Sequence, residues 1–239
     1  MNPLKPPRKT LVLIALVALL AFTVYRKQLE LESDKRAVII DQLYSENREY
    51  GFSDRCSTLL EAEGYSVRLC RGENVSVDFL RDSKWSMDII VLRMHSGVFD
   101  NFTWLFTHEP YSSKKHVTEQ LTGEINIGVC PSVDYHVFTV SSRFIGVNAV
   151  LDGGLVLVMG CSGLEKNDLG EALMESGAGA VIGWDGSVTV EETDKAVLSL
   201  LMEILDGKTI GEAVGAQEQL SSGVRLGFYP SYSGDYKLG

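Results

Sequence analysis

The chain has 239 residues and a net charge of −10, from 22 basic and 32 acidic side chains. Proteins that bind nucleic acid need basic patches to meet the phosphates, so this acidic balance excludes nucleic acid as the expected partner. Four cysteines in a chain of this length do not make the dense disulfide framework of small secreted domains.

The first segment predicts a membrane anchor. Residues 1–9 are basic and proline-rich, and residues 10–25 carry no charge before Arg26 and Lys27 close the run. The run is slightly short for a bilayer span, which leaves a cleaved signal peptide as the alternative. It lacks a clear small-x-small cleavage site and therefore favours an uncleaved signal anchor. The basic residues ahead of it favour a cytoplasmic N-terminus, with the following domain outside the cytoplasm. Residues 26–35 then form a short charged linker.

Residues 36–239 are enough for one sizeable core and predict a single α/β domain. Apolar runs of strand length alternate with amphipathic segments of helix length, which is typical of a mostly parallel sheet flanked by helices. Strands are expected at residues 38–40, 65–69, 87–94, 135–140, 155–159 and 180–183, and after residue 225. Helices are expected at residues 52–63, 77–81, 143–151, 168–176, 190–205 and 209–220, and a hairpin within 97–113.

Two of the expected strands end in residues suited to thiol chemistry. One leads into His95 and Gly97, and another leads into Cys161 between two glycines. The carboxyl ends of parallel strands meet at one edge of a sheet, where ligands bind in open α/β folds. Each residue alone is most often structural, but their shared strand-then-glycine context predicts that His95 and Cys161 form a catalytic thiol–imidazole pair.

The order of this pair separates families of thiol enzymes. All four histidines precede Cys161, whereas class I glutamine amidotransferases and papain-like enzymes carry their histidine after the cysteine. A His-Ser-Gly turn after one strand and a Cys turn after the next resembles the caspase–gingipain–clostripain clan of cysteine peptidases. The resemblance covers residues 36–238 and includes the stretches RAVIIDQLY, DIIVLRMHSG, WLFTHEPY, GAGAVIGWDGS and GDYKL.

The resemblance implies a three-layer caspase–hemoglobinase-like fold for residues 36–239 and a cysteine endopeptidase activity. It implies that Cys161 attacks a peptide carbonyl as a thiolate and that His95 protonates the departing amine. It also implies that backbone amides of Gly97 and Cys161 hold the oxyanion. The expected partner is a peptide or protein substrate, and the expectation includes no cofactor, no metal and no named third member of a triad.

The resemblance also suggests where a basic P1 side chain would bind. Clan members that cleave after Arg or Lys often carry an acid two residues before the cysteine, a position that Met159 fills here. Trp184 and Asp185 resemble the aromatic-charged pair that lines the caspase pocket, so Asp185 is expected to bind Arg or Lys in a charge-assisted pair. Asp41, at the end of the first strand, is the other candidate. The alternative is that both acids are solvated loop residues.

Other functions and sites stay open at this point. The same fold could serve as an inactive binding module at the cell surface, and the same dyad could serve an amidase or an acyltransferase. Cys130 lies in a loop before a proline and is the other candidate nucleophile. Cys56 and Cys70 either pair outside the cell or remain free thiols. The dispersed histidines fit no familiar zinc spacing, so no metal site is expected.

Overall fold

The computed structural model describes residues 16–19, 35–82, 84–131, 133–217, 219–220 and 222–238. The predicted anchor at residues 10–25 lies outside the described residues except for 16–19, and the predicted linker lies outside them except for Lys35. Among the described residues, none belongs to a helix that has the length and apolar character needed to cross a membrane.

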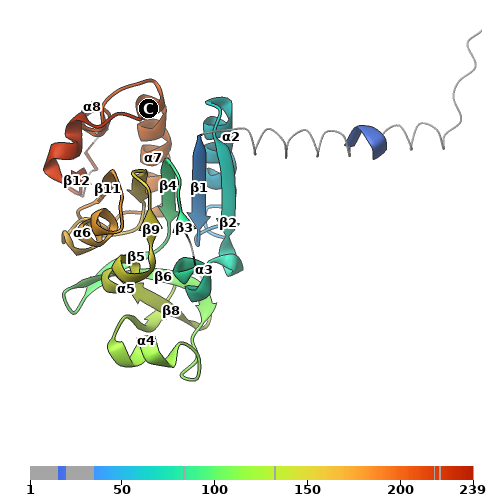
Figure 1. Ribbon diagram of the computed structural model, residues 1–239, viewed down its shortest axis with the longest axis vertical. Coiled ribbons are helices and arrows are strands. Elements are labelled where there is room, and N and C mark those ends of the chain that lie inside the picture. The colour runs from blue at the N-terminus through green and yellow to red at the C-terminus, as the bar shows by residue number, and fades with distance from the viewer. Residues whose placement is uncertain are drawn as a thin grey trace, which may run out of the picture.

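A six-stranded sheet forms the centre of the domain, with the strand order β12-β11-β10-β4-β1-β2 (Figure 1). Its parallel strands are β1 (Arg36–Asp41), β2 (Ser66–Arg71), β4 (Ile89–Arg93), β10 (Leu155–Val158) and β11 (Ala180–Trp184). At one edge, β12 (Leu226–Tyr229) pairs with β11 in the antiparallel direction. The sheet is therefore mixed and mostly parallel, which confirms the predicted α/β class.

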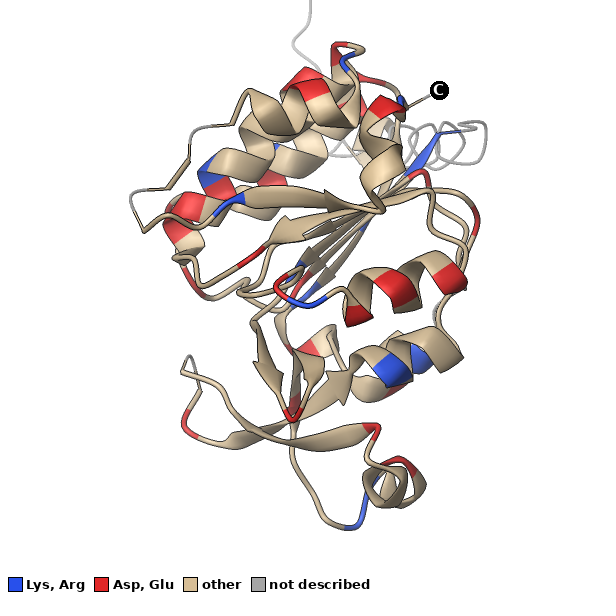
Figure 2. Ribbon diagram, turned by 90° about the vertical axis from the view of Figure 1, so that its left-hand side faces the viewer, with Lys and Arg blue, Asp and Glu red and all other residues tan. Residues whose placement is uncertain are grey.

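A smaller antiparallel sheet follows the carboxyl end of β4, and Figure 2 shows it below the central sheet. Its order is β5-β6-β8-β7, formed by β5 (Ser96–Phe99), β6 (Phe102–Pro110), β8 (His136–Ser141) and β7 (Ile125–Val129). The hairpin of β5 and β6 confirms the prediction for residues 97–113, and α4 (Val117–Thr122) connects β6 to β7. Because β5 starts one residue after His95, this second sheet lies beside the predicted site.

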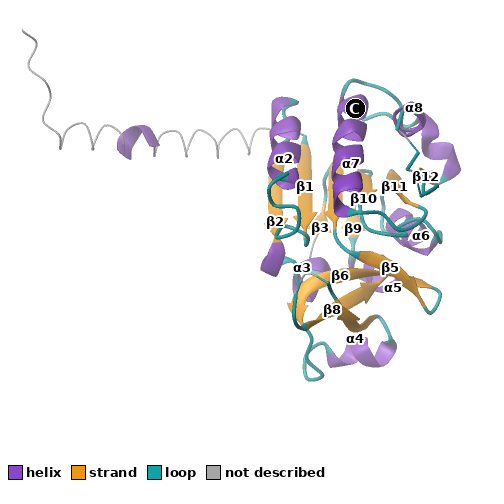
Figure 3. Cartoon of the chain, turned by 180° about the vertical axis from the view of Figure 1, so that it is seen from behind, coloured by secondary structure: helices purple, strands orange, loops and turns teal. Residues whose placement is uncertain are grey.

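Helices cover both faces of the central sheet, as Figure 3 shows for α2 and α7 on one face. That face packs against α2 (Phe52–Ala62), α7 (Val190–Leu205) and α8 (Ile210–Gly215). The opposite face packs against α3 (Val77–Arg81), α5 (Ser142–Asn148) and α6 (Asp168–Glu175). In β1, Val38 and Ile40 enter one core while Ala37 and Ile39 enter the other. A strand buried on both faces needs such a continuous apolar run.

Some boundaries differ from the sequence prediction. The helix expected at residues 143–151 ends at Asn148, because Val150 and Leu151 form β9 and pair with β3 (Lys84–Trp85). The helix expected to reach residue 220 ends at Gly215, where glycine lowers helix propensity. β7 was not predicted, since this edge strand has one neighbour and a weak pattern. Short 3₁₀ segments occupy Gly72–Asn74 and Ser231–Asp235.

Candidate active site

The two predicted catalytic residues lie on turns that touch one another. His95 follows β4 and Cys161 follows β10, and these strands are parallel neighbours. The Ser96 hydroxyl donates a hydrogen bond to the Cys161 carbonyl oxygen at 2.7 Å. A Cβ atom on Gly160 would lie 2.1 Å from Ser96 Oγ and 2.3 Å from the Met94 carbonyl oxygen, so this close approach requires glycine. Both turns therefore occupy one place at the carboxyl edge of the sheet.

The Cys161 thiol is partly exposed and lies against the loop after β11. Its sulfur accepts a hydrogen bond from the Val188 N–H at 3.4 Å and donates one to the Val188 carbonyl oxygen at 3.4 Å. The next residue, Ser162, has a left-handed φ of 57°, and its N–H donates to the Gly186 carbonyl oxygen at 2.8 Å. In the described part of the chain, the sulfur and His95 are not hydrogen-bonded. Such a gap is compatible with a dyad, because catalytic hydrogen bonds often tighten only with substrate bound.

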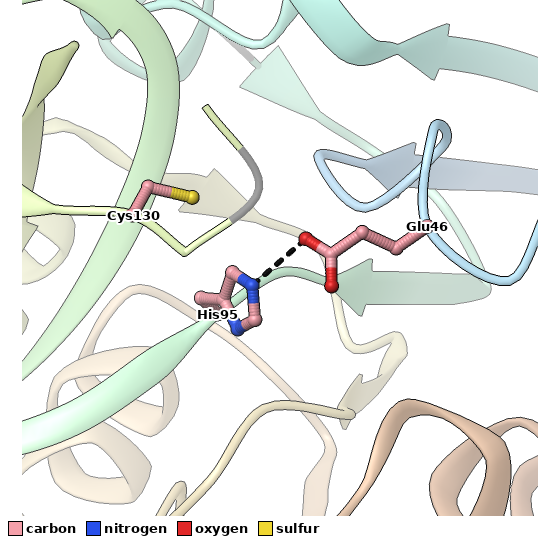
Figure 4. Close-up of side chains that lie close together, drawn as sticks. All are labelled: Glu46, His95 and Cys130. Carbon is pink, nitrogen blue, oxygen red and sulfur yellow. Dashed lines mark hydrogen bonds and ion pairs between the residues drawn. The ribbon is translucent and has the colours of Figure 1, made fainter. Parts of the chain in front are cut away.

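A carboxylate that the sequence did not reveal holds the His95 ring. His95 Nε2 lies 2.9 Å from Glu46 Oε1, and each side chain is 22% exposed. The His95 backbone N–H donates to Gln42 Oε1 at 3.0 Å, and the ring packs edge-on against Phe106. Because a carboxylate only accepts hydrogen bonds, Nε2 carries the proton of this contact, and Nδ1 is the ring nitrogen that can serve as a base. Figure 4 shows Nδ1 on the side of the ring that points away from Glu46.

A buried arginine fixes the loop that carries Glu46. The Arg93 guanidinium, from β4, donates to Asp41 at 2.6 Å and to the two oxygens of Asp194 at 2.7 and 2.9 Å. It also donates to the Glu46 backbone carbonyl oxygen at 3.2 Å. Burial raises the pKa of the Asp41 carboxyl, and the nearby Arg93 charge offsets part of that rise. The guanidinium thus ties β1, β4 and α7 to the loop after β1.

Gly97, the predicted oxyanion donor, lines an apolar groove on the smaller sheet. The groove has a volume of about 400 Å³ and is walled by residues 97–99, 104, 106, 126–128 and 139. Phe106 both lines the groove and packs against the His95 ring, so the groove adjoins the imidazole. Phe99 at its wall is 67% exposed. A half-open apolar groove of this kind suits side chains of an extended peptide.

Two of the three residues predicted for the S1 pocket lie inside the protein. Trp184 is 1% exposed, and its indole N–H donates to the Thr193 hydroxyl at 2.9 Å. Asp41 is also 1% exposed, and its carboxylate binds Arg93. Neither side chain reaches the surface, because each completes a buried polar contact of the core.

Asp185 has a different environment, at the exposed end of β11. Its Oδ1 accepts a hydrogen bond from the Arg225 backbone N–H at 2.8 Å, which joins it to the start of β12. It directly precedes Gly186, whose carbonyl oxygen binds the turn after Cys161. Of the predicted S1 residues, Asp185 therefore offers an accessible carboxylate near the thiol.

The other three cysteines lie inside the protein. Cys56 and Cys70 do not form the disulfide considered from the sequence, and burial raises the pKa of Cys56 to about 12 and that of Cys70 to about 11. Cys130, after β7, is 1% exposed and lies close to Glu46 and His95 (Figure 4). The loop that carries Cys130 thus reaches the candidate site from the smaller sheet.

The sequence matches no protein-family model and no curated protein. The site itself combines a partly exposed thiol, an imidazole oriented by a carboxylate, and an adjoining groove. Sequence reasoning missed Glu46, although one signal could have pointed to it. Glu46 comes shortly after the first strand, whose carboxyl end shares the edge with His95 and Cys161.

Proposed function

We propose that the chain is a membrane-anchored cysteine endopeptidase of the caspase–gingipain–clostripain type, with Cys161 as nucleophile and His95 as general acid and base. The main support is the convergence of two turns at one sheet edge. One turn carries an imidazole oriented by Glu46, the other carries a partly exposed thiol, and a 2.7 Å hydrogen bond from Ser96 joins them. The layered α/β architecture is compatible with the caspase–hemoglobinase-like fold of that clan.

In the proposed mechanism, the Cys161 thiol gives its proton to His95 Nδ1, and the thiolate attacks the carbonyl carbon of the scissile peptide bond. The Gly97 and Cys161 backbone N–H groups donate to the oxyanion of the tetrahedral intermediate. The C–N bond then breaks, the leaving amine takes the proton from His95, and a thioester remains on Cys161. Water, deprotonated by His95, hydrolyses the thioester and restores the thiol. Glu46 keeps the ring oriented and stabilises the imidazolium.

A screen of the full-length protein against a fluorogenic peptide library tests this proposal. Cys161→Ala and His95→Ala should each lower kcat roughly 100-fold or more, because the two residues act as one unit. Glu46→Gln should lower kcat with little change in KM, since Glu46 positions the base without touching substrate. Cys70→Ala, which alters a thiol elsewhere in the fold, is the matched control and should keep full activity.

Normal turnover by Cys161→Ala would end the proposal at this site. Acylation of Cys161 by a reactive probe, without cleavage of any peptide, would instead assign the dyad to an amidase or an acyltransferase. Absence of both cleavage and acylation would favour a binding module.

Specificity forms a second part of the proposal, with Asp185 as the group that binds Arg or Lys at P1. A hydrogen bond to a charged group contributes about 1.5–3 kcal/mol, which is roughly tenfold to hundredfold in rate. Asp185→Asn should therefore lower kcat/KM by that factor on Arg substrates and hardly change it on neutral ones. A P1 scan of both proteins measures this. A wild-type preference for apolar P1 side chains would assign the P1 pocket to the apolar groove instead.

A further inference from the structure

Cys130 takes no part in the proposed mechanism, although it lies beside the imidazole that does. One ligand atom from each of Glu46, His95 and Cys130 lies within 4.8 Å of the other two. Figure 4 shows the three side chains pointing toward a common centre. They come from the loop after β1, the turn after β4 and the loop after β7, so the fold rather than the local sequence brings them together.

The cluster is tied together by a neighbouring amide. Gln42 Nε2 donates to the Cys130 sulfur at 3.5 Å, while Gln42 Oε1 accepts from the His95 backbone N–H at 3.0 Å. Arg93 donates a hydrogen bond to the Glu46 backbone carbonyl oxygen and so holds the loop that carries this ligand. Outer partners of this kind fix the orientation of metal ligands and strengthen binding. The cluster is also largely shielded, since Cys130 is 1% exposed and the other two side chains are 22% exposed.

We propose that Glu46, His95 and Cys130 bind a thiophilic divalent cation, with Zn²⁺ the best match. Zinc takes thiolate sulfur at about 2.3 Å, imidazole nitrogen at about 2.0–2.1 Å and carboxylate oxygen at about 2.0–2.2 Å. Tetrahedral ligands at those distances lie about 3.5 Å apart, so the cluster closes around the ion by side-chain shifts of roughly 1 Å. Mg²⁺ and Ca²⁺ prefer all-oxygen ligands, and the sulfur disfavours both.

Binding of the cation has a direct chemical consequence for His95. Without the ion, Nε2–H donates to Glu46 and the lone pair on Nδ1 serves as the base. With the ion on Nε2, the neutral ring carries its proton on Nδ1 and cannot accept the proton of Cys161. The Cys130 proton leaves to solvent as the thiolate forms. The ion is therefore a reversible inhibitor. This inhibition rests on the proposed function, whereas the binding does not.

Zinc binding to the full-length protein, measured by competition with a chromogenic chelator, tests the site. Wild type and Cys161→Ser should each bind one ion in the cluster. Cys130→Ser and Glu46→Gln should bind it at least about tenfold more weakly, because loss of even an outer partner costs 10–100-fold. Titration with Co²⁺ should give a sulfur-to-cobalt absorption band in wild type and in Cys161→Ser, and not in Cys130→Ser.

Absence of the cobalt band in the wild type would refute the proposed metal site, and this result does not depend on whether the variants fold. Unchanged zinc affinity in a folded Cys130→Ser protein would overturn it as well. Equal weakening by Cys161→Ser would do the same, because the ion would then lie on the catalytic thiol.

A separate peptidase assay tests the inhibition. Zinc that saturates the site should abolish turnover in wild type, a chelator should restore it, and Cys130→Ser should stay active at the same free zinc concentration. Zinc binding without peptidase activity in any condition would refute the proposed function and leave the site intact. Full activity of the zinc-loaded wild type, or stimulation by zinc, would overturn the inhibition and leave the dyad intact.

Discussion

At the scale of single residues, the surroundings of each cysteine set its reactivity. The thiolate is the nucleophilic form of a cysteine, and burial in apolar surroundings disfavours it. Burial raises the pKa of Cys56 to about 12 and that of Cys70 to about 11, from an ordinary value of 9.0. Cys161 differs from these two because its side chain is partly exposed and its sulfur accepts a backbone N–H.

Alkylation of the native protein should therefore distinguish the cysteines. With iodoacetamide at about pH 8, Cys161 should react first, while Cys56, Cys70 and Cys130 should react only after unfolding. Mass spectrometry of peptides from a time course measures the order, and Cys161→Ala should lose the fast phase. Fast alkylation of Cys130 would contradict its burial and would indicate that Cys130, and not Cys161, is the reactive thiol near His95.

The residues that the sequence could reveal are those that end a regular element. His95 and Cys161 each follow an apolar strand, so their place at the carboxyl edge could be inferred from the pattern alone. Glu46 lies in an irregular loop whose path depends on a hydrogen bond from Arg93, which is distant in the sequence. Cys130 reaches the site through the pairing of β7 with β8, and an edge strand leaves little trace of its register in the sequence.

At the scale of elements, two helices begin with the same capping box. Thr189 at the start of α7 accepts a hydrogen bond from the Glu192 N–H, and Glu192 accepts one from the Thr189 N–H. Thr209 and Glu212 repeat the arrangement at α8. The two caps differ in their neighbours, since Thr189 directly follows the residue whose backbone binds the Cys161 sulfur. The α7 cap therefore also fixes the backbone of Val188, which contacts the Cys161 sulfur.

Removing the two caps one at a time should lower the stability of both variants but the activity of only one. Thr189→Ala and Thr209→Ala should each lower the free energy of unfolding by about 1 kcal/mol, the usual effect of removing an N-cap. Thr189→Ala should also lower kcat, because the Val188 backbone is then less firmly placed. Urea unfolding and peptide turnover of the two variants provide the comparison. Equal kcat in both would show that the cap does not position the thiol.

The helix starts at this scale were well predicted, because caps leave a local signature. The predicted helices at residues 77–81 and 190–205 have the bounds of α3 and α7, and the side chains of Ser76 and Thr189 cap their first turns. The short strands β3 and β9 were missed, because each is stabilised by pairing with a segment far away in the chain.

At the scale of the whole molecule, the Arg93 guanidinium joins two strands and a helix inside the core. Arg93→Leu should lower the free energy of unfolding by about 3–5 kcal/mol, because Asp41 and Asp194 are left buried and unpaired. Urea unfolding should show a smaller deficit as the pH falls from about 7. The sign follows from Arg93, whose charge and hydrogen bond lower the pKa of the Asp41 carboxyl against the effect of burial. Without Arg93 that pKa rises further, so the folded variant gains more stability than the wild type from binding a proton.

A more exposed arginine provides the control for that measurement. Arg81 pairs with Asp78 and Glu119, and its side chain is 27% exposed. Arg81→Leu should cost no more than about 1 kcal/mol, as is usual for surface ion pairs. A similar loss in both variants would mean that burial of the Arg93 cluster has no special effect.

Membrane fractionation and protease digestion of intact cells would test the predicted anchor. Residues 10–25 should hold the full chain in the membrane fraction, and added protease should digest the domain without lysis. A variant with charged substitutions in that run should lose its membrane attachment. Protection of the domain until the cells are opened would reverse the proposed topology.

The common direction of the parallel strands determines which way an anchored domain would face. β1 starts at Arg36, at the amino edge of the central sheet, and the turns of His95 and Cys161 lie at the carboxyl edge. A domain suspended by the segment ahead of β1 would therefore hold its thiol at the end remote from the lipid. Its natural targets would be chains that stand clear of the bilayer surface, such as loops of neighbouring proteins or free peptides, and not segments embedded within it.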